Sequence, residues 1–184
     1  TLGRMPCELL IKMAIEIGID TPNFIPAIPI YRNELKANYT NARQIFESAL
    51  KKVESEPDVA VGLANSALES VIKEILTDDR FSGCCNEKDT LSKQIENICK
   101  AFNIEPNNTI PKEIRDIASG LMKVSKSIED IRSTKSSFHG KTNNDYIISE
   151  SNMAYFIVNA TTTVGLFLLS YYKENFPKQQ DLPL

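Results

Sequence analysis

The chain has 184 residues, a length typical of one globular domain, and 42% of them are hydrophobic, which is enough to fill a core. Its 21 basic and 24 acidic residues give a formal net charge of −3, which excludes a protein that wraps nucleic acid by overall charge but leaves room for a local basic patch. Seven glycines, nine prolines and no tryptophan argue against collagen-like, linker-rich or many-turned all-β chains. The composition therefore favours helices and excludes two large domains.

Residues 1–38 are predicted to form an N-terminal extension. Apolar residues recur at spacings of three and four over residues 5–17, which predicts a short amphipathic helix. The prolines that follow lack a backbone donor and favour extended conformations in the residues before them, so residues 18 to about 36 are expected to form an irregular strap. The prolines of the strap and the apolar side chains expected to pack on the body are Pro22, Pro26, Pro29, Phe24, Ile28 and Ile30.

Residues 39–176 follow the 3.6-residue period of α-helices, and no segment shows sustained strand alternation or an internal repeat. The helices are expected to start at Thr40, Pro57, Thr90, Thr109 to Pro111, and Ser149 or Ser151, the last of them running to about Lys173. A tail covers residues 177–184. The predicted fold class is an all-α bundle of four to five long helices, preceded by the short N-terminal helix and the Pro-rich strap.

The last helix is almost apolar enough to be taken for a membrane span. Asn159 and three consecutive threonines occupy its middle, and no basic cluster flanks it, so a buried core helix is favoured and no membrane partner is expected. The beginning of the chain lacks the uninterrupted apolar core of a secretory signal. We therefore expect a cytoplasmic protein.

The cysteines and the single histidine, His139, do not form a metal-binding pattern. Cys84 and Cys85 are adjacent, a spacing that makes a strained disulfide, so reduced thiols are expected. The sequence contains no dinucleotide-binding, Walker, zinc-protease or serine-hydrolase motif. These observations predict neither a metal nor a cofactor.

The chemistry-bearing residues gather in residues 127–141, SIEDIRSTKSSFHGK. Ile128 and Ile131 continue the core stripe of their helix, so Arg132 is predicted to lie in its final turn and to point away from the core. A polar loop follows, and Gly140 gives the backbone the freedom to present His139 at a loop edge.

This pair of side chains suits phosphodiester chemistry. An imidazole exchanges a proton near neutral pH, and a guanidinium holds a phosphate in a bidentate fork. Five basic and two acidic residues give residues 123–141 a net charge of +3, so the rest of the chain carries −6. The alternative is structural: His139 merely ends a loop, and Arg132 is a solvated cation favoured by the helix dipole.

Arg132 and His139, with six residues between them, resemble the R-x4-6-H motif of the HEPN superfamily, helical bundles of prokaryotic toxin and phage-defence systems. Over residues 40–175, the segments LANSALESVIKEIL and NATTTVGLFLL further resemble the C-terminal domain of abortive-infection (Abi) proteins. The resemblance implies a metal-independent RNA endonuclease in abortive infection, or a toxin, with Arg132 and His139 catalytic. It also implies products with 2′,3′-cyclic phosphate ends and a homodimer with one composite cleft.

Five further residues complete the predicted site. Ser133, Lys135 and Lys141 are candidates to bind substrate, and Glu69 and Glu129 are candidates to orient the motif. Alternatively, Glu69 only forms an ion pair with Lys73, four residues further along the same helix, and Glu129 is simply solvated.

Two residues depart from the family pattern. Ser133 follows the arginine where HEPN ribonucleases often carry Asn, Asp or His, and Asn65 stands where a basic residue is expected. The second hypothesis is therefore an inactive helical module that dimerises and acts as a sensor. Expected partners are RNA, a second copy of the chain, and a preceding sensor domain or a cognate defence or antitoxin protein.

Overall fold

The computed structural model describes residues 27–84, 86, 89–104, 111–135 and 148–177. Within these ranges the chain is helical and contains no strand, which confirms the predicted all-α fold class. The elements in chain order are α2 (Ala27–Asn38), α3 (Thr40–Lys52), α4 (Pro57–Leu76), the short 3₁₀ turn η2 (Asp79–Phe81), α5 (Leu91–Ala101), α6 (Lys112–Lys135) and α7 (Ser151–Asn175). The helix predicted over residues 5–17 lies outside the described residues.

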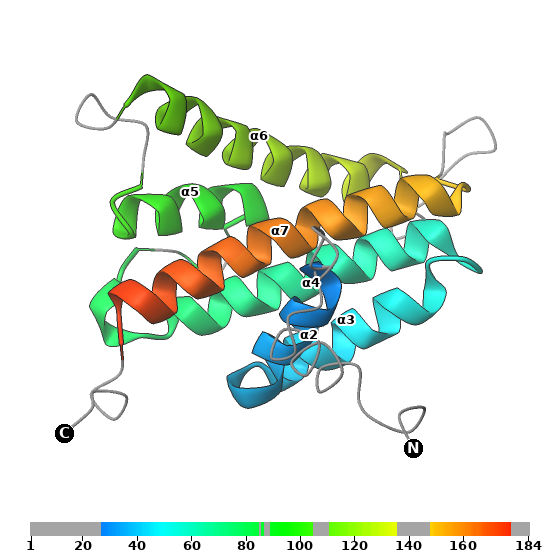
Figure 1. The fold of residues 1–184 in the computed structure, drawn as a ribbon, viewed down its shortest axis with the longest axis horizontal. Helices are drawn as coiled ribbons and strands as arrows, with labels where there is room; N and C mark the ends of the chain where they lie inside the picture. Colours follow the sequence, from blue (N-terminus) through cyan, green and yellow to red (C-terminus); the bar gives the residue numbers. More distant parts are fainter. Residues whose placement is uncertain (1–26, 85, 87–88, 105–110, 136–147, 178–184) are drawn as a thin grey trace, which may run out of the picture.

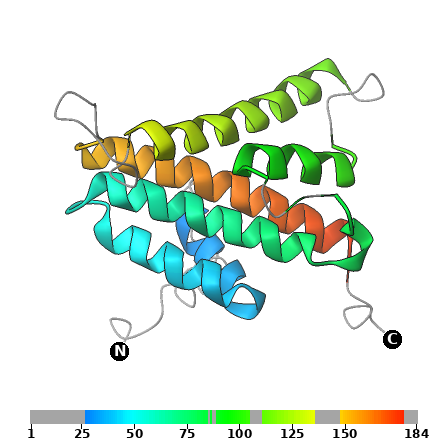
Figure 2. The same cartoon turned by 180° about the vertical axis from the view of Figure 1, so that it is seen from behind.

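The helices form three layers, with α4 and α7 in the middle, α2 and α3 on one side, and α5 and α6 on the other (Figures 1 and 2). The contact between α3 and α4 is the most extensive in the bundle, followed by the contact between α4 and α7. Small residues let these helices approach closely, since Ala60, Ala64 and Ala67 on α4 are fully buried. The helix starting at Pro57 is therefore the central helix of the bundle, as its wide apolar stripe predicts.

Helix α2 corrects the prediction of an irregular strap. Residues 27–38 are helical because Pro29 falls in the first turn, where the backbone N–H has no partner within the helix and proline is tolerated. Tyr31 and Leu35 are fully buried, so α2 belongs to the body of the bundle. The side chain of Ile30, expected to pack, is 38% exposed.

A close approach joins α2 to α7. A Cβ atom at Gly165 would lie 2.6 Å from Cε2 of the Tyr31 ring, so glycine is required where the ring crosses α7. The ring of Tyr31 also meets Phe46 of α3 edge to face at a centroid distance of 4.9 Å. Burial, with the nearby Tyr39 hydroxyl adding to it, raises the pKa of Tyr31 well above its ordinary value.

Helix α7 is the helix whose composition also suits a membrane span. Among the described helices it alone is long and apolar enough to cross a bilayer, and half of its most apolar window is buried inside the molecule. It packs against α2, α4 and α6 in this structure. The hydroxyls of Thr161 and Thr162, both fully buried, donate to carbonyls one turn earlier, at 2.9 and 2.8 Å, so these polar residues are compatible with a core helix.

Helices α5 and α6 pack side by side over the central layer (Figure 1). Thr90 caps α5 as predicted, because its hydroxyl accepts the backbone N–H of Lys93 at 3.3 Å. Helix α6 begins at Lys112, directly after Pro111, and runs through Gly120 without interruption. It is antiparallel to both α4 and α7, so its C-terminal end lies near the start of those two helices (Figures 1 and 2).

Candidate functional site

Arg132 lies in the last turn of α6, as predicted, but its side chain does not point away from the bundle. Its Nη1 atom is 3.5 Å from Oε2 of Glu69 on α4, and 34% of the side chain is exposed. The helix turns this face inward because Ile128, one turn earlier, is buried in the core. The Arg132 side chain is therefore held at the edge of the α4–α6 contact, with its Nε atom buried and about a third of the side chain exposed.

Glu69 is shared between two cations. Its Oε1 atom lies 2.7 Å from the Nζ atom of Lys73, one turn further along α4, while its Oε2 atom faces Arg132. Both interpretations of Glu69 are thus observed together, the pair within α4 and the contact to the motif arginine. The Glu69 side chain is 24% exposed, so its carboxylate can fix the position of the arginine and also lower the positive potential around it.

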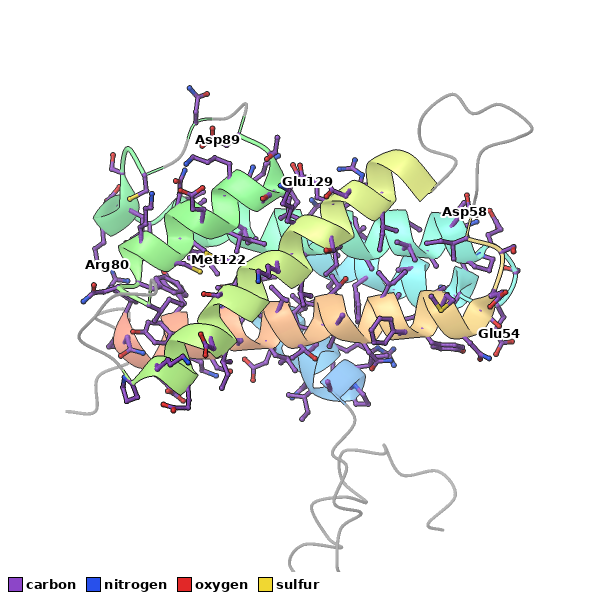
Figure 3. The ribbon with its side chains drawn as sticks, turned by 90° about the horizontal axis from the view of Figure 1, so that it is seen from above. Glu54, Asp58, Arg80, Asp89, Met122 and Glu129 are labelled. Carbon is purple, nitrogen blue, oxygen red and sulfur yellow. The ribbon has the colours of Figure 1, made fainter. Side chains whose placement is uncertain are left out.

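Glu129 contacts a different part of the fold. Its Oε2 atom accepts the backbone N–H of Ser92 at 2.9 Å, in the first turn of α5. Figure 3 shows Glu129 on the side of α6 that faces α5. A carboxylate at a helix N-terminus satisfies an otherwise unpartnered N–H and complements the helix dipole, so Glu129 ties α6 to α5.

The remaining predicted site residues are only partly covered by the structure. The backbones of Ser133 and Lys135 end α6, but their side chains lie outside the described residues. His139 and Lys141 lie wholly outside them. The distance between the two motif side chains, and any contact of the three candidate substrate-binding residues, therefore stay predictions.

Sequence reasoning singled out Asn65 as a departure from the family pattern but gave it no role. The side chain is fully buried on α4, and neither Nδ2 nor Oδ1 has a hydrogen-bond partner. A buried amide without partners is costly, so the signal was present in the sequence as a polar residue within an apolar helical stripe.

Two hollows open beside α4. The smaller, about 410 Å³, runs along α3 and α4 and includes Glu69 and Lys73 in its wall. The larger, about 740 Å³, lies between α2 and the C-terminal ends of α4 and α7, away from the predicted site residues. Within the described ranges, no three Asp, Glu, His or Cys side chains are grouped so that they could hold a metal ion.

These observations define the class of protein as an all-α bundle with a motif arginine at the contact between two of its long helices. The family model Abi_C, described as a HEPN-like domain, matches residues 40–172. The chain belongs to this family, and the membership supports a role of the HEPN type in abortive infection. No curated protein and no solved structure matched the chain.

Proposed function

We propose that the protein is a metal-independent RNA endonuclease that acts in anti-phage abortive infection or as a toxin. The observation that carries the proposal is Arg132 of the Arg-x6-His motif, which pairs with Glu69 at the α4–α6 contact while 34% of its side chain is exposed. A cation in a fixed and accessible position is suited to stabilise charge on a phosphate. Family membership supports the same role.

The proposed reaction is a transesterification within the RNA. The ribose 2′-hydroxyl attacks the neighbouring phosphorus, and His139 accepts the hydroxyl proton as general base. Arg132 stabilises the negative charge that develops on the phosphoryl oxygens. The bond from phosphorus to the 5′-oxygen of the next nucleotide breaks, and this oxygen takes a proton from the imidazolium of His139, which acts as general acid, or from solvent. The products are a 2′,3′-cyclic phosphate and a 5′-hydroxyl. Ser133, Lys135 and Lys141 are proposed to contact neighbouring phosphates.

The site is proposed to be completed by a second copy of the chain. Large apolar side chains are exposed on both α6 and α7. On α6 they are Ile117, at 73%, and Val124, and on α7 they are Phe156, at 68%, Met153 and Phe167. Large exposed apolar residues on two helices that pack against each other are typical of an interaction surface. A homodimer through this surface would bring two motifs together in one cleft.

Cleavage of a structured RNA in the presence of a chelator tests the enzyme directly. Arg132→Ala and His139→Ala should each abolish cleavage while the helical spectrum stays unchanged, and the double variant should resemble each single variant because the residues act as a unit. RNA with 2′-deoxyribose at the scissile position should resist. Equal cleavage of that deoxy substrate would show that water is the nucleophile. Ribose-containing RNA that stays intact with the wild-type protein at high concentration would contradict the proposed ribonuclease activity altogether.

Sedimentation velocity tests the homodimer. Ile117→Glu combined with Phe156→Glu should convert the dimer to a 20.6 kDa monomer, because two charges would enter the apolar contact. Ile30→Glu is the matched control, since Ile30 is also an exposed apolar residue but lies on α2. A wild-type protein that is monomeric at all accessible concentrations would contradict the composite cleft.

A second candidate function is an inactive module that dimerises and senses or recruits a partner in a defence system. Ser133 after the motif arginine favours it, because family ribonucleases often carry Asn, Asp or His there. Its partner would be a preceding sensor domain or a cognate defence or antitoxin protein in the cytoplasm. If the protein is such a module, RNA should stay intact in the cleavage assay and sedimentation velocity should show a stable dimer.

A further inference from the structure

Asn65 differs from the other buried polar side chains of the bundle. The hydroxyls of Ser125, Thr161 and Thr162 all donate to carbonyls of their own helix at 2.8 to 2.9 Å. Asn65 is the described buried side chain in which two polar atoms, a donor and an acceptor, are both without a partner. An apolar side chain of similar size would fill the same space without this cost, so packing alone does not explain an asparagine here.

The amide lies on the face of α4 that meets the motif. Asn65 and Glu69 are four residues apart, so they occupy the same face of the helix one turn apart. Glu69 contacts Arg132 of α6 across this face. Because α4 and α6 are antiparallel (Figures 1 and 2), one turn back from Glu69 on α4 leads towards the C-terminal end of α6. Asn65 is therefore inferred to lie on the side of Arg132 nearer the C-terminal end of α6.

The chemistry of an amide complements that of the carboxylate. Glu69 fixes Arg132 by an ion pair, which also reduces the charge available to a phosphate. A guanidinium has five N–H donors, and a bidentate phosphate takes two, so other acceptors are needed to keep the planar group in place. The oxygen of an amide accepts such a bond without neutralising the charge. Its N–H₂ group can at the same time donate to a carboxylate one turn away.

We propose that Asn65 is a positioning residue for Arg132, and this inference rests on the proposed ribonuclease function. When Arg132 binds the scissile phosphate of RNA, the Oδ1 atom of Asn65 accepts a hydrogen bond from the guanidinium. Nδ2 of Asn65 then donates to the carboxylate of Glu69, which the phosphate has displaced. Both unpartnered atoms of Asn65 are satisfied in that state, and Arg132 keeps its orientation with its charge intact.

The test compares Asn65→Leu with the wild-type protein in chelator, using the structured RNA as substrate. Leucine is similar in size and removes both unpartnered atoms, so the urea midpoint should stay unchanged or rise. The value of kcat should fall about tenfold or more while KM changes less than about twofold, because a guanidinium without this hydrogen bond still binds the phosphate but is misaligned with the oxygens on which charge develops in the transition state. Thr162→Val is the matched control, a buried polar residue on α7, and should leave kcat unchanged.

A second background shows whether Asn65 acts through Arg132. Arg132→Lys removes the planar fork, so adding Asn65→Leu to it should cause little further loss of kcat. If leucine disturbs folding, Asn65→Ala should give the same fall in kcat with a native helical spectrum. If the wild-type protein cleaves RNA and both Asn65 variants cleave it equally well, this inference alone is overturned. Absence of cleavage by the wild-type protein would overturn the proposed function and this inference together.

Discussion

Two clusters join distant segments of this bundle, and they are built in opposite ways. The first, here called the aromatic cluster, comprises Phe81, Phe102, Tyr171, Tyr172 and Phe176. The second, here called the polar cluster, comprises Asn65, Glu69 and Arg132. The aromatic cluster ties η2, the end of α5 and the end of α7 together, whereas the polar cluster lies between α4 and α6.

Polar groups in the aromatic cluster have partners. The hydroxyl of Tyr171 donates to the carbonyl of Phe102 at 2.9 Å, and the hydroxyl of Tyr172 donates to Oδ2 of Asp78 at 2.6 Å. Arg80 donates to Asp78 and to the carbonyl of Phe176, and its guanidinium lies 5.5 Å from the Phe176 ring centroid. Figure 3 shows Arg80 at this end of the molecule.

The polar cluster leaves groups unsatisfied or shared. Asn65 has no hydrogen-bond partner, and Glu69 divides its charge between Lys73 and Arg132. Proteins depart from ideal packing mainly at functional sites, where stability is given up for chemistry. The comparison therefore supports the proposal that the polar cluster serves function, whereas the aromatic cluster serves stability.

The largest expected effect is on the aromatic cluster. Phe102→Ala should lower the free energy of unfolding by about 3 to 5 kcal/mol, because the buried ring contacts several others and its loss leaves a cavity. Urea denaturation measures the change, with Ile30→Ala on the exposed face of α2 as a control that should lose less than about 1 kcal/mol. RNA cleavage per folded molecule should stay unchanged. If folded Phe102→Ala lost cleavage activity, the separation of a stabilising cluster from a functional one would be wrong.

A smaller effect is expected where the aromatic cluster meets η2. The hydrogen bonds and charge of Arg80, with the Tyr172 hydroxyl adding to them, hold the pKa of Asp78 well below its usual range. Asp78→Asn should cost about 1 kcal/mol near pH 7, since part of the hydrogen bonding survives in the amide.

The pH dependence of that difference has a definite sign. A carboxyl whose pKa is lowered by folding stabilises the native state above its unfolded pKa of about 4, and this contribution is lost as the pH falls further. The gap between wild type and Asp78→Asn in urea denaturation should therefore be full at pH 6 to 7 and shrink below about pH 4. If the difference in free energy of unfolding between the two proteins grew in acid, the lowered pKa of Asp78 would be contradicted.

The helical part of the fold could be predicted because it depends on local pattern. Apolar spacing located α3, α4 and α7, and Thr90 marked the start of α5 through its side-chain cap. The prediction was wrong at α2, where prolines were taken to prevent a helix. Pro29 falls in the first turn, the one part of a helix in which its missing N–H does no harm.

Contacts between distant segments could be predicted only in part. The Arg132 motif and Glu69 were identified from the sequence, but the inward turn of Arg132 depends on how α6 crosses α4. Phe81, in η2 between α4 and α5, is buried because Phe102 and Tyr172 pack around it, and no local pattern carries that information.

The smallest expected change in stability comes from Lys73, yet it probes the polar cluster most directly. Lys73→Met removes the solvent-exposed ion pair between Lys73 and Glu69 within α4, so the free energy of unfolding should change by less than about 0.5 kcal/mol. Glu69 then keeps its ion pair with Arg132 and competes more strongly with the phosphate of the RNA for this arginine. Relative to the wild-type protein, kcat/KM of the variant for RNA cleavage should be severalfold lower at low salt. This difference should shrink at higher salt, because salt screens the carboxylate. Lys93→Met is the matched control, because Glu96 on α5 is likewise shared by Lys93 and Lys100. An equal fall in cleavage for both variants would mean that general surface charge, rather than the charge on Glu69, governs RNA cleavage.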